Sequence, residues 1–564
     1  MEWLSGFLES YPELAVFLAI SIGYMLGDVK IGGFSFGPVT GSLVAGILIG
    51  QIAEVPVSAM AKSFLFLLFL FGIGYSVGPQ FMQAMKRDGL RAVLLASVCT
   101  TTGLLVAYTA SRILGLDPGY SAGMLSGGLT QSAAMGTATE AINNLAIPLE
   151  EQQRYVAHVG VADAVCYLFG VVGAIWFCSS LAPKLLGADL EAEARKMEAE
   201  LGLEPTHQGV LSGYRQFEMR AYRLPANAEV VGLTIQQAEQ RRAEDRFFIP
   251  RLRREGNILL ATPDLVLKAG DVIAVTGRRK AMIEKIGDPH DAEIDDFELL
   301  DIPMKVVDVL MSRRELDGRQ LADIATEPWT RGIYLRTLRR GAENVPIGAK
   351  MELFRGDVLT LVGPEDAVDA AAKKIGPIIA PTTSTDFVVL GLAIFLGGMV
   401  GVLVKFTIGG AVISLGTSVG ALVAGLVVGH MRTRHPLFGR IPDGAVALMT
   451  SLGLAAFVAM TGLHAGPVFL DALRDAGIGL FFGGMAVTLT PLLVGLAFGR
   501  YILRMPPVLL LGALAGALTM TAAMGAVQQR SKSPVAVLGY TPAYPIANIL
   551  LTLWGTVIVI LTAG

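Results

Sequence analysis

The sequence predicts a polytopic α-helical membrane protein in which two related halves flank a soluble α+β insert. Only 16% of the 564 residues are charged, whereas soluble domains carry about 25%, so a bilayer is the expected solvent for most of the chain. Of the 45 Lys and Arg residues, 28 lie between residues 189 and 376. The halves are related because SGGLTQSAAMG at 126–136 returns as AGALTMTAAMG at 515–525.

Each half contains six apolar segments, several of which approach the ~20 residues that cross hydrocarbon. They lie near 12–27, 36–53, 61–81, 90–114, 118–142 and 156–182 in the first half, and near 386–404, 411–430, 444–462, 477–498, 506–527 and 535–562 in the second. Two further matches follow the same order: GSLVAGILIG (41–50) with GALVAGLVVG (420–429), and GYSVGPQFMQAMKRDG (74–89) with GLHAGPVFLDALRDAG (462–477). Such small-residue runs favour close helix packing in lipid.

The basic residues predict that the two halves have inverted topology. If the fifth segment of each half returns to the side it entered from, each half crosses five times. The 17 Lys and Arg residues outside the insert then divide 12 inside and 5 outside, whereas six full crossings give 8 and 9. Cytoplasmic loops collect Lys and Arg, so we expect a cytoplasmic insert and both termini outside. Whether the fifth segment is re-entrant or a broken crossing helix stays open.

The repeated motif predicts a binding site near the middle of the membrane. Gly, Thr and Ser can break a helix there if the freed backbone faces protein or a water-filled cavity. Two breaks that enter from opposite faces bring helix N-termini together, and their N–H groups suit a carboxylate. A single motif of this kind is more often a packing feature, but its recurrence at matching positions favours a site.

The candidate substrate-binding residues come from both copies of the motif and from LGYTPAYPIANIL (538–550). They are Gly128, Thr130, Gln131, Ser132, Thr519, Thr521, Tyr540, Thr541, Tyr544 and Asn548. The two prolines of this segment predict an unwound or kinked entry. Asp163, which we align with Pro542, is the candidate for coupling to a proton or cation or for binding an ammonium. A satisfied Asp near a helix end is an equally good interpretation.

Several classes of function are disfavoured. Cys99, Cys166 and Cys178 lie in apolar segments without CxxC spacing, so we expect buried thiols. We expect no metal and no cofactor, and the halves contain no nucleophile–base pair, so an enzyme is not expected. A net charge of −3 without a basic face disfavours a nucleic-acid partner.

The insert contains two similar units, at about 215–288 and 297–376, after a short charged helix at 189–203. LKAGDVIAVTG (267–277) aligns with LFRGDVLTLVG (353–363), and both predict a strand after a Gly-Asp turn. Each unit ends in a helical pattern, MIEKIG or VDAAAKKIG. With FFIPRLRR and GIYLRTLRRG, these units resemble the C-terminal domains of regulators of potassium conductance. The resemblance implies a cytoplasmic regulatory or dimerisation pair, a small-molecule regulator and a homodimer.

The whole layout resembles the aspartate–alanine exchanger family. GSLVAGILIG, SGGLTQSAAMG, LTMTAAMG and GYTPAYPIANIL carry the resemblance, which covers essentially the whole chain. It implies a secondary transporter of the bacterial inner membrane that exchanges or exports small carboxylate solutes, such as aspartate, alanine or dicarboxylates.

Two alternatives stay open. Asp163 favours a proton- or sodium-coupled symporter or a cation antiporter, and the regulatory units are compatible with a gated channel. The expected domains are 1–185 and 381–564 in the lipid bilayer, with 186–290 as the linker helix and first regulatory unit and 291–380 as the second regulatory unit.

Overall fold

The structure is a computed structural model that describes residues 2–31, 34–35, 37–84, 90–203, 217–240, 247–278, 293–341, 343–379, 384–408, 411–434 and 438–563. The chain forms two compact units. The membrane unit comprises Met1–Glu200, Arg340–Pro346 and Pro381–Gly564, and the insert unit comprises Leu201–Arg339 and Ile347–Ala380.

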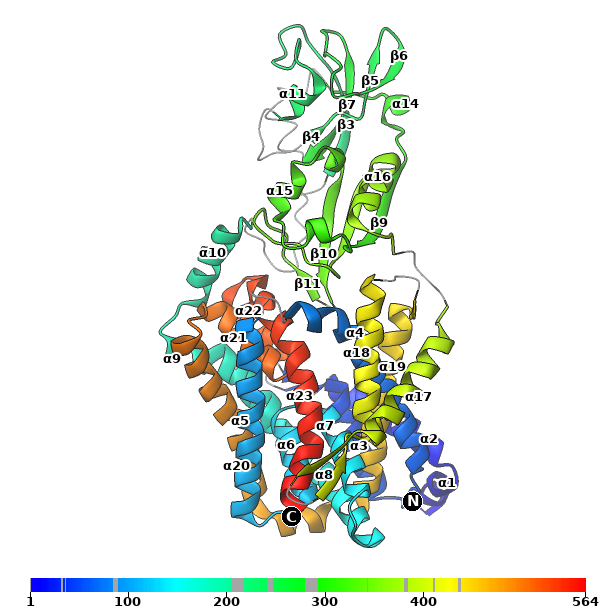
Figure 1. Cartoon of the computed structure of the whole chain (residues 1–564), viewed down its shortest axis with the longest axis vertical. Helices are drawn as coiled ribbons and strands as arrows, with labels where there is room; N and C mark the ends of the chain where they lie inside the picture. Colours follow the sequence, from blue (N-terminus) through cyan, green and yellow to red (C-terminus); the bar gives the residue numbers. More distant parts are fainter. Residues whose placement is uncertain are drawn as a thin grey trace. The chain divides into compact units, whose positions relative to one another are not determined.

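The membrane unit is helical (Figure 1). The first half contains α1 (Glu2–Ser10), α2 (Pro12–Gly27), α3 (Gly37–Gly50), α4 (Ala59–Ala84), α5 (Leu90–Leu114), α6 (Pro118–Gly128), α7 (Ser132–Asn143) and α8 (Leu149–Trp176), followed by the π-helix η1 (Phe177–Leu181), α9 (Ala182–Leu186) and α10 (Leu190–Leu201). The second half contains α17 (Phe387–Leu403), α18 (Gly416–Arg434), α19 (Asp443–Ala465), η5 (Gly466–Val468), α20 (Phe469–Ala497), the π-helix η6 (Phe498–Ile502), α21 (Pro507–Ala517), α22 (Thr521–Ser531), η7 (Pro534–Ala536) and α23 (Val537–Ala563).

Among the described residues, five helices are long and apolar enough to cross a membrane, or six if α1 and α2, which meet at 109°, form one span. The prediction of a polytopic helical protein is therefore confirmed. One predicted segment, 411–430, is helical only from Gly416, because its first residues form a β-hairpin of β13 (Lys405–Ile408) and β14 (Ala411–Ser414). In the sequence, Gly409 and Gly410 stand between β-branched residues, a pattern that favours a hairpin. The first half has a matching hairpin of β1 (Lys30–Ile31) and β2 (Phe34–Ser35).

The helix directions show that the halves are inverted. A Cβ added at Gly46 or Gly50 of α3 would lie 2.4 or 2.5 Å from the carbonyl oxygens of Ala459 or Leu463, so α3 runs parallel to α19. By the same test with Gly74 and Gly78, α4 runs parallel to α18. Helix α4 is antiparallel to α19. Gly72 contacts Thr450 and Leu65 contacts Gly453, so the residue numbers fall along α4 as they rise along α19. Helix α18, the repeat of α3, therefore runs opposite to α3.

Glycine explains why these parallel pairs form. In each pair a GxxxG of one helix faces a GxxxG of the other: Gly46 and Gly50 face Gly462 and Gly466, and Gly74 and Gly78 face Gly425 and Gly429. A side chain on any of them would collide with the facing backbone, so small residues set the approach.

The fifth segment of each half is a re-entrant hairpin. Gly119, Gly123 and Gly127 of α6 face the carbonyls of Tyr155, Val159 and Asp163, so α6 runs parallel to α8. If α7 continued in the direction of α6, its end would lie roughly 35 Å from the start of α6. Six residues from Asn143 to Leu149 reach at most about 21 Å, so α7 must return.

The second half repeats this geometry. Gly512 and Gly516 of α21 face the carbonyls of Ala536 and Tyr540 of α23, so α21 and α23 are parallel and α22 returns. We call α6–α7 hairpin 1 and α21–α22 hairpin 2.

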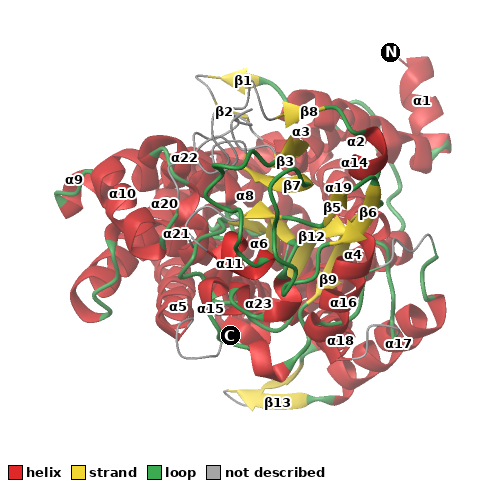
Figure 2. Cartoon of the chain, turned by 90° about the horizontal axis from the view of Figure 1, so that it is seen from above, coloured by secondary structure: helices red, strands yellow, loops and turns green. Residues whose placement is uncertain are grey.

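The membrane unit divides into two groups of helices. The core group consists of α5–α9 and α20–α23, which contact one another extensively; the flanking group consists of α2–α4 and α17–α19. In Figure 2, α5, α20 and α21 lie toward one side of the unit and α2, α17 and α18 toward the other. Apart from the short α9, each group draws equally on the two halves, as expected for an inverted repeat.

The insert unit is α+β. One antiparallel sheet has the order β6-β5-β7-β3-β8, with β4 also paired to β7; its strands are β3 (Phe217–Arg223), β4 (Phe247–Phe248), β5 (Arg251–Arg254), β6 (Asn257–Leu260), β7 (Val272–Arg278) and β8 (Glu293–Ile294). The other contains β9 (Met304–Leu310), β10 (Tyr334–Arg340) and β12 (Val358–Pro364) in the order β10-β12-β9. Strand β11 (Glu343–Val345) lies in the segment Arg340–Pro346, which groups with the membrane unit. The helices of the insert unit are α11 (Ile235–Gln240), α14 (Phe297–Leu300), α15 (Leu321–Ala325) and α16 (Glu365–Ile375), with 3-10 turns η3 (Arg314–Leu316) and η4 (Pro328–Thr330).

The predicted Gly-Asp turns precede β7 and β12. Gly270 and Gly356 have φ of 86° and 97°, a conformation that favours glycine. The following buried carboxylates, Asp271 and Asp357, each accept a hydrogen bond from the backbone N–H three residues earlier, at 2.8 and 2.9 Å. Helix α10 and helix α16 occupy the predicted helical stretches, whereas MIEKIG lies outside the described residues.

Candidate functional site

The tips of the two hairpins have the same unusual backbone. Thr130 and Thr519 have φ of 56° and 55°, in the left-handed region that a β-branched residue rarely adopts. The N–H of Gln131 donates to Ser126 O at 2.8 Å, and the N–H of Met520 donates to Ala515 O at 2.9 Å. Each tip is thus a Schellman cap with Thr where Gly is usual. Strain of this kind persists where the surroundings impose it, typically at functional sites.

Each tip presents an uncapped helix N-terminus. The residues before α7 and α22, Gln131 and Met520, make no side-chain cap. Within the described residues, no hydrogen bond involves the backbone N–H of Ser132 or Thr521. Ser132 is buried, where N–H groups normally have partners, and each helix N-terminus carries about half a positive charge. Both tips are therefore suited to an anion.

The tips meet across the repeat. The hydroxyl of Thr130 donates to the carbonyl of Leu518, the residue before Thr519, at 3.1 Å. Thr488 of α20 donates to Gly128 O at 2.7 Å. Gly170 of α8 lies against tip 1, because a Cβ there would be 2.5 Å from Gly127 O and 3.0 Å from Thr130 Cγ2. The contact between the two hairpin tips is therefore held by residues of both halves.

Hairpin 1 is packed against α23 through polar contacts. The amide of Gln131 donates to Asn548 Oδ1 at 3.0 Å, and the hydroxyl of Thr137 donates to Thr552 O at 2.7 Å. Gln131, Ser132 and Asn548 are all buried.

Hairpin 2 is polar but open. Thr521 Oγ1 lies 3.1 Å from the hydroxyl of Tyr540, and the rings of Tyr540 and Tyr544 stack at 5.4 Å. Thr521 is exposed, whereas its repeat partner, Ser132, is 4% exposed.

The next turn shows the same asymmetry. A Cβ on Gly136 would lie 2.0 Å from the ring of Phe66, whereas a Cβ on Gly525 would meet nothing within 4 Å. The exposed face of α22 continues to Gln529 and Lys532, toward η1, which it contacts. The region where the two tips meet is therefore covered by protein on the side of hairpin 1 and accessible along the exposed face of hairpin 2.

Of the predicted site residues, the structure brings together Gly128, Thr130, Gln131 and Asn548 at tip 1, and Thr519, Thr521, Tyr540 and Tyr544 at tip 2. Ser132 contributes the first N–H of α7. Thr541 is less available, because its hydroxyl donates to Val537 O of its own helix at 2.8 Å. The prolines predict an unwound or kinked entry. The unwound alternative is wrong, because α23 is helical from Val537 through Pro542 and Pro545.

Asp163 lies beside the contact between the two hairpin tips and is not part of it. It is 2% exposed, between α6 and α8, and accepts a 2.5 Å hydrogen bond from Ser126. Among the described residues it has no ion-pair partner. The alignment with Pro542 is wrong, because Gly127 faces Asp163 where Gly516 faces Tyr540, so Asp163 and Tyr540 are the repeat partners.

Sequence reasoning missed Thr488, Gly170, Thr137 and Thr552. Thr488 and Gly170 belong to helices that carry no repeated polar motif. Thr137 lies one residue past the first copy of the motif, and Thr552 lies just past LGYTPAYPIANIL.

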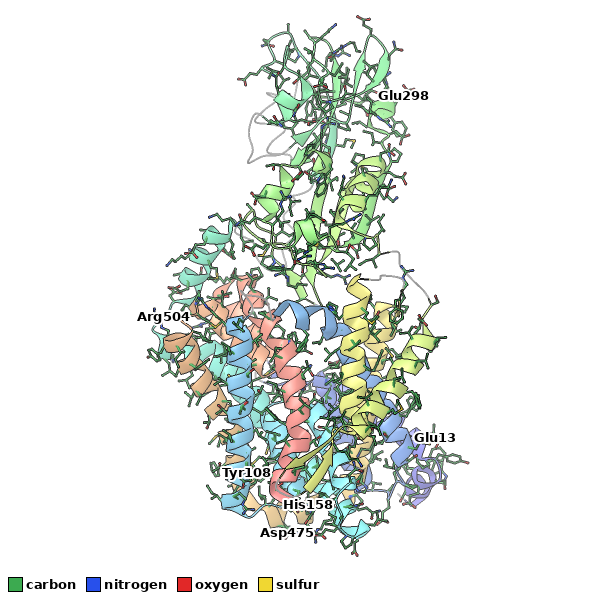
Figure 3. The ribbon with its side chains drawn as sticks, viewed as in Figure 1. Glu13, Tyr108, His158, Glu298, Asp475 and Arg504 are labelled. Carbon is green, nitrogen blue, oxygen red and sulfur yellow. The ribbon has the colours of Figure 1, made fainter. Side chains whose placement is uncertain are left out.

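The outer end of hairpin 1 is anchored to α8. His158 Nδ1 lies 2.6 Å from Asp117 Oδ2, and the His158 ring stacks on Tyr120 at 4.0 Å. Asp117 also caps α6 by accepting from Tyr120 N at 2.9 Å. Within the membrane unit, His158 and Arg504 lie at opposite ends (Figure 3), consistent with hairpins that enter from opposite sides.

Comparisons with known proteins agree with this architecture. A family model described as a predicted permease membrane region, Asp-Al_Ex, matches residues 15–183 and 389–560, and a TrkA-C domain model matches residues 219–286. An uncharacterized transporter of Bradyrhizobium diazoefficiens is 56% identical over 92% of this chain and 100% of its own length. Uncharacterized transporters of Shewanella oneidensis and Bordetella parapertussis are 39% and 38% identical, over 100% and 99% of this chain and 100% and 98% of their own lengths.

No solved structure matches the chain. The matched model covers both membrane halves, including the two hairpins and the helices that hold them. The chain is a membrane transporter, and it belongs to the aspartate–alanine exchanger family, with a TrkA-C domain in its insert.

Proposed function

We propose that this transporter is a secondary carrier that exchanges or exports small carboxylate solutes, such as aspartate, alanine or dicarboxylates, by alternating access. The meeting of the two uncapped tips is the observation that carries the proposal. Two helix N-termini, from α7 and α22, converge where Thr130 contacts Leu518. Unpaired N–H groups and positive dipole ends attract a carboxylate.

The residues around the tips have distinct roles in this proposal. The N–H groups of Ser132 and Thr521, with the hydroxyls of Thr130, Thr519 and Thr521, hold the carboxylate. Gln131 and Asn548, which already pair with each other at 3.0 Å, discriminate the remainder of the solute. Tyr540 and Tyr544 form the aromatic wall on the accessible side.

The unequal cover of the tips supports alternating access. Phe66 of the flanking group closes over Gly136, whereas Gly525 at the repeat-related position is open. If Gly136 became open and Gly525 became covered, the site between the tips would open to the opposite side of the membrane, as expected for an inverted repeat. In a bacterial inner membrane, a carrier of this kind with a cytoplasmic insert is accessible from the cytoplasm in this conformation.

Transport by reconstituted protein tests the proposal. In proteoliposomes loaded with aspartate, we expect counterflow of labelled aspartate or another dicarboxylate by the wild type. Thr130→Val with Thr519→Val keeps the branched shape and removes both hydroxyls, so we expect counterflow to be lost while the gel-filtration profile is kept. The matched control is Thr109→Val, on an exposed face of α5. Undiminished counterflow in the double variant would overturn the site.

A second candidate function rests on Asp163. A buried carboxyl group within a membrane segment, with Ser126 as its one hydrogen-bond partner among the described residues, is typical of proton or cation coupling. If the protein is a coupled symporter or cation antiporter, an imposed ion gradient alone should drive uptake, and Asp163→Asn should abolish that drive. If it is an exchanger, counterflow should need trans solute and survive Asp163→Asn.

A further inference from the structure

A cavity of about 710 Å³ lies at the α9 end of the core group, remote from the hairpin tips. Three structural elements form it: the η1–α9 turn, the first turn of α10 and the last turn of α22. Its lining residues are Ser179, Ser180, Pro183, Lys184, Gly187, Ala188, Asp189, Leu190, Glu191, Gln529, Arg530 and Lys532. Nothing in the carboxylate site described above uses these residues.

The two acidic residues in the cavity are already satisfied. Asp189 accepts from the backbone N–H of Glu191 at 3.0 Å and so caps α10. Glu191 pairs with Arg195 and, at 3.0 Å, with Lys532. The pKa of Glu191 is lowered by its hydrogen bond with Lys532. Both carboxylates therefore act within the wall of the cavity.

Two cations in the cavity have no such partner. Among the residues that the structure describes, Lys184 and Arg530 form no ion pair. They come from α9 and α22, so they approach the cavity from two of its sides. The hydroxyls of Ser179 and Ser180, 3.3 Å apart on the π-helix, add donors between them. Guanidinium, ammonium and hydroxyl groups together suit the oxygens of a phosphate.

The surroundings of the cavity are those of a membrane surface. Trp176, the last residue of α8, and Leu185 of α9 are 48% and 56% exposed. Aromatic residues gather at membrane interfaces. Basic pockets between membrane helices on the cytoplasmic side bind anionic lipid headgroups. A lipid seated here would place its headgroup on Lys184 and Arg530 and its chains over Leu185.

We propose that this cavity binds a phosphate-bearing anion, which the headgroup of an anionic phospholipid supplies in the membrane. The bound phosphate bridges Lys184 on α9 and Arg530 on α22. It thereby ties the outer end of hairpin 2 to the end of α8, and makes the stability of hairpin 2 depend on the lipid.

Native mass spectrometry of the full chain, titrated with phosphatidylglycerol or phosphatidylcholine, tests the proposal. We expect tight retention of phosphatidylglycerol over phosphatidylcholine by the wild type. In K184Q/R530Q the affinity for phosphatidylglycerol should fall by roughly thirtyfold, since each cation near a membrane surface is worth about fivefold. Arg500→Gln with Arg504→Gln removes two cations near the same end, outside the cavity, and should leave retention unchanged.

A thermal-shift titration with inorganic phosphate distinguishes the two sources of the anion. Protection by phosphate, lost in K184Q/R530Q, together with equal retention of both lipids, assigns the site to a soluble phosphate compound. The proposal is overturned if the wild type retains both lipids equally and phosphate does not raise its unfolding temperature. This comparison needs no variant. Equal retention of phosphatidylglycerol by wild type and K184Q/R530Q also overturns it.

Discussion

Thr130 and Thr519 are 389 residues apart in sequence and occupy the same left-handed position at the tips of two hairpins that meet: the Thr130 hydroxyl donates to the carbonyl that precedes Thr519, at 3.1 Å. Glycine would adopt this backbone without strain, so the repeated choice of threonine must have another cause. The hydroxyl supplies one, because it places a hydrogen-bonding group beside each uncapped helix N-terminus.

Replacement of either tip threonine by glycine should separate stability from transport. Thr130→Gly or Thr519→Gly relieves left-handed strain of about 1 kcal/mol, so we expect thermal unfolding at an equal or higher temperature, with transport strongly reduced. The matched control is Thr109→Gly, in the helical interior of α5, which should cost about 1 kcal/mol. A clear loss of stability in the tip variants would mean that the tips are not strained.

Gly170 should be the least tolerant position beside the tips. Gly170→Ala places a Cβ 2.5 Å from Gly127 O, and overpacking of this kind costs about 1–3 kcal/mol. We expect lower thermal stability and loss of counterflow. Gly525→Ala, where a Cβ meets nothing within 4 Å, should be neutral or stabilising because alanine favours helix. Equal behaviour of the two variants would contradict the close approach of α8 to tip 1.

Gln131 and Asn548 should be energetically coupled. A double-mutant cycle with Gln131→Ala and Asn548→Ala, read by thermal unfolding in detergent, should give a coupling energy of about 1 kcal/mol. Gln131→Ala combined with Thr109→Ala, at a site without contact, should be additive. Additivity of the first pair would show that the 3.0 Å contact does not hold hairpin 1 to α23.

The sequence could predict the plan of the fold because the plan depends on features visible along the chain. Apolar segments, the three repeated motifs and the distribution of Lys and Arg were sufficient for a membrane protein with inverted halves. The distribution of Lys and Arg favoured a fifth segment that returns, but the sequence left a re-entrant hairpin and a broken crossing helix open, because the choice depends on the parallel packing of α6 on α8. The β13–β14 hairpin was hidden because its β-branched residues are as apolar as a helix in lipid.

Candidate site residues were selected from the repeated motif and from LGYTPAYPIANIL, and the residues that were missed lie outside both. The tips share seven of eleven letters, so Thr130, Gln131, Thr519 and Thr521 could be selected. Helices α8 and α23 have diverged, so Asp163 was aligned two residues away from its true partner, Tyr540. Thr488 and Gly170 reach the tips only through the packing of α20 and α8, for which the sequence contains no local signal.

Glu140 should bias the protein toward the observed conformation. Its carboxylate accepts from Thr417 N at 2.6 Å and Ser418 N at 3.1 Å, and so caps α18 of the flanking group from hairpin 1. Its repeat partner at the same offset, Gln529, is exposed. A carboxylate at a helix N-terminus is worth about 1 kcal/mol, so Glu140→Gln should lower the population of this conformation several-fold. Gln529→Asn, which leaves the cap intact, is the control, and reactivity of a cysteine at 521 measures the population.

The insert should lose a stabilising contact in acid. Arg253 donates to both oxygens of Asp296, at 2.7 and 2.8 Å, and this hydrogen bonding lowers the pKa of Asp296. A lowered pKa stabilises the fold above the unfolded value of about 4, and the contribution disappears as the pH falls through the folded pKa. Hydrogen exchange at residues 293–300, corrected for intrinsic rates, should accelerate below about pH 4. Arg253→Gln should weaken this dependence; an unchanged profile would contradict the assignment to this pair.

Thiol labelling at the two tips tests the central claim most directly, that they form one site which opens on alternate sides. The native Cys99, Cys166 and Cys178 are buried, so the wild type should label little. Thr521→Cys should react with a membrane-impermeant maleimide from the side of the insert, and carboxylate solute should protect it. Ser132→Cys should react from the opposite side, and only during transport. Labelling of both cysteines from one side, or of Thr521→Cys without protection by any transported solute, would contradict the account.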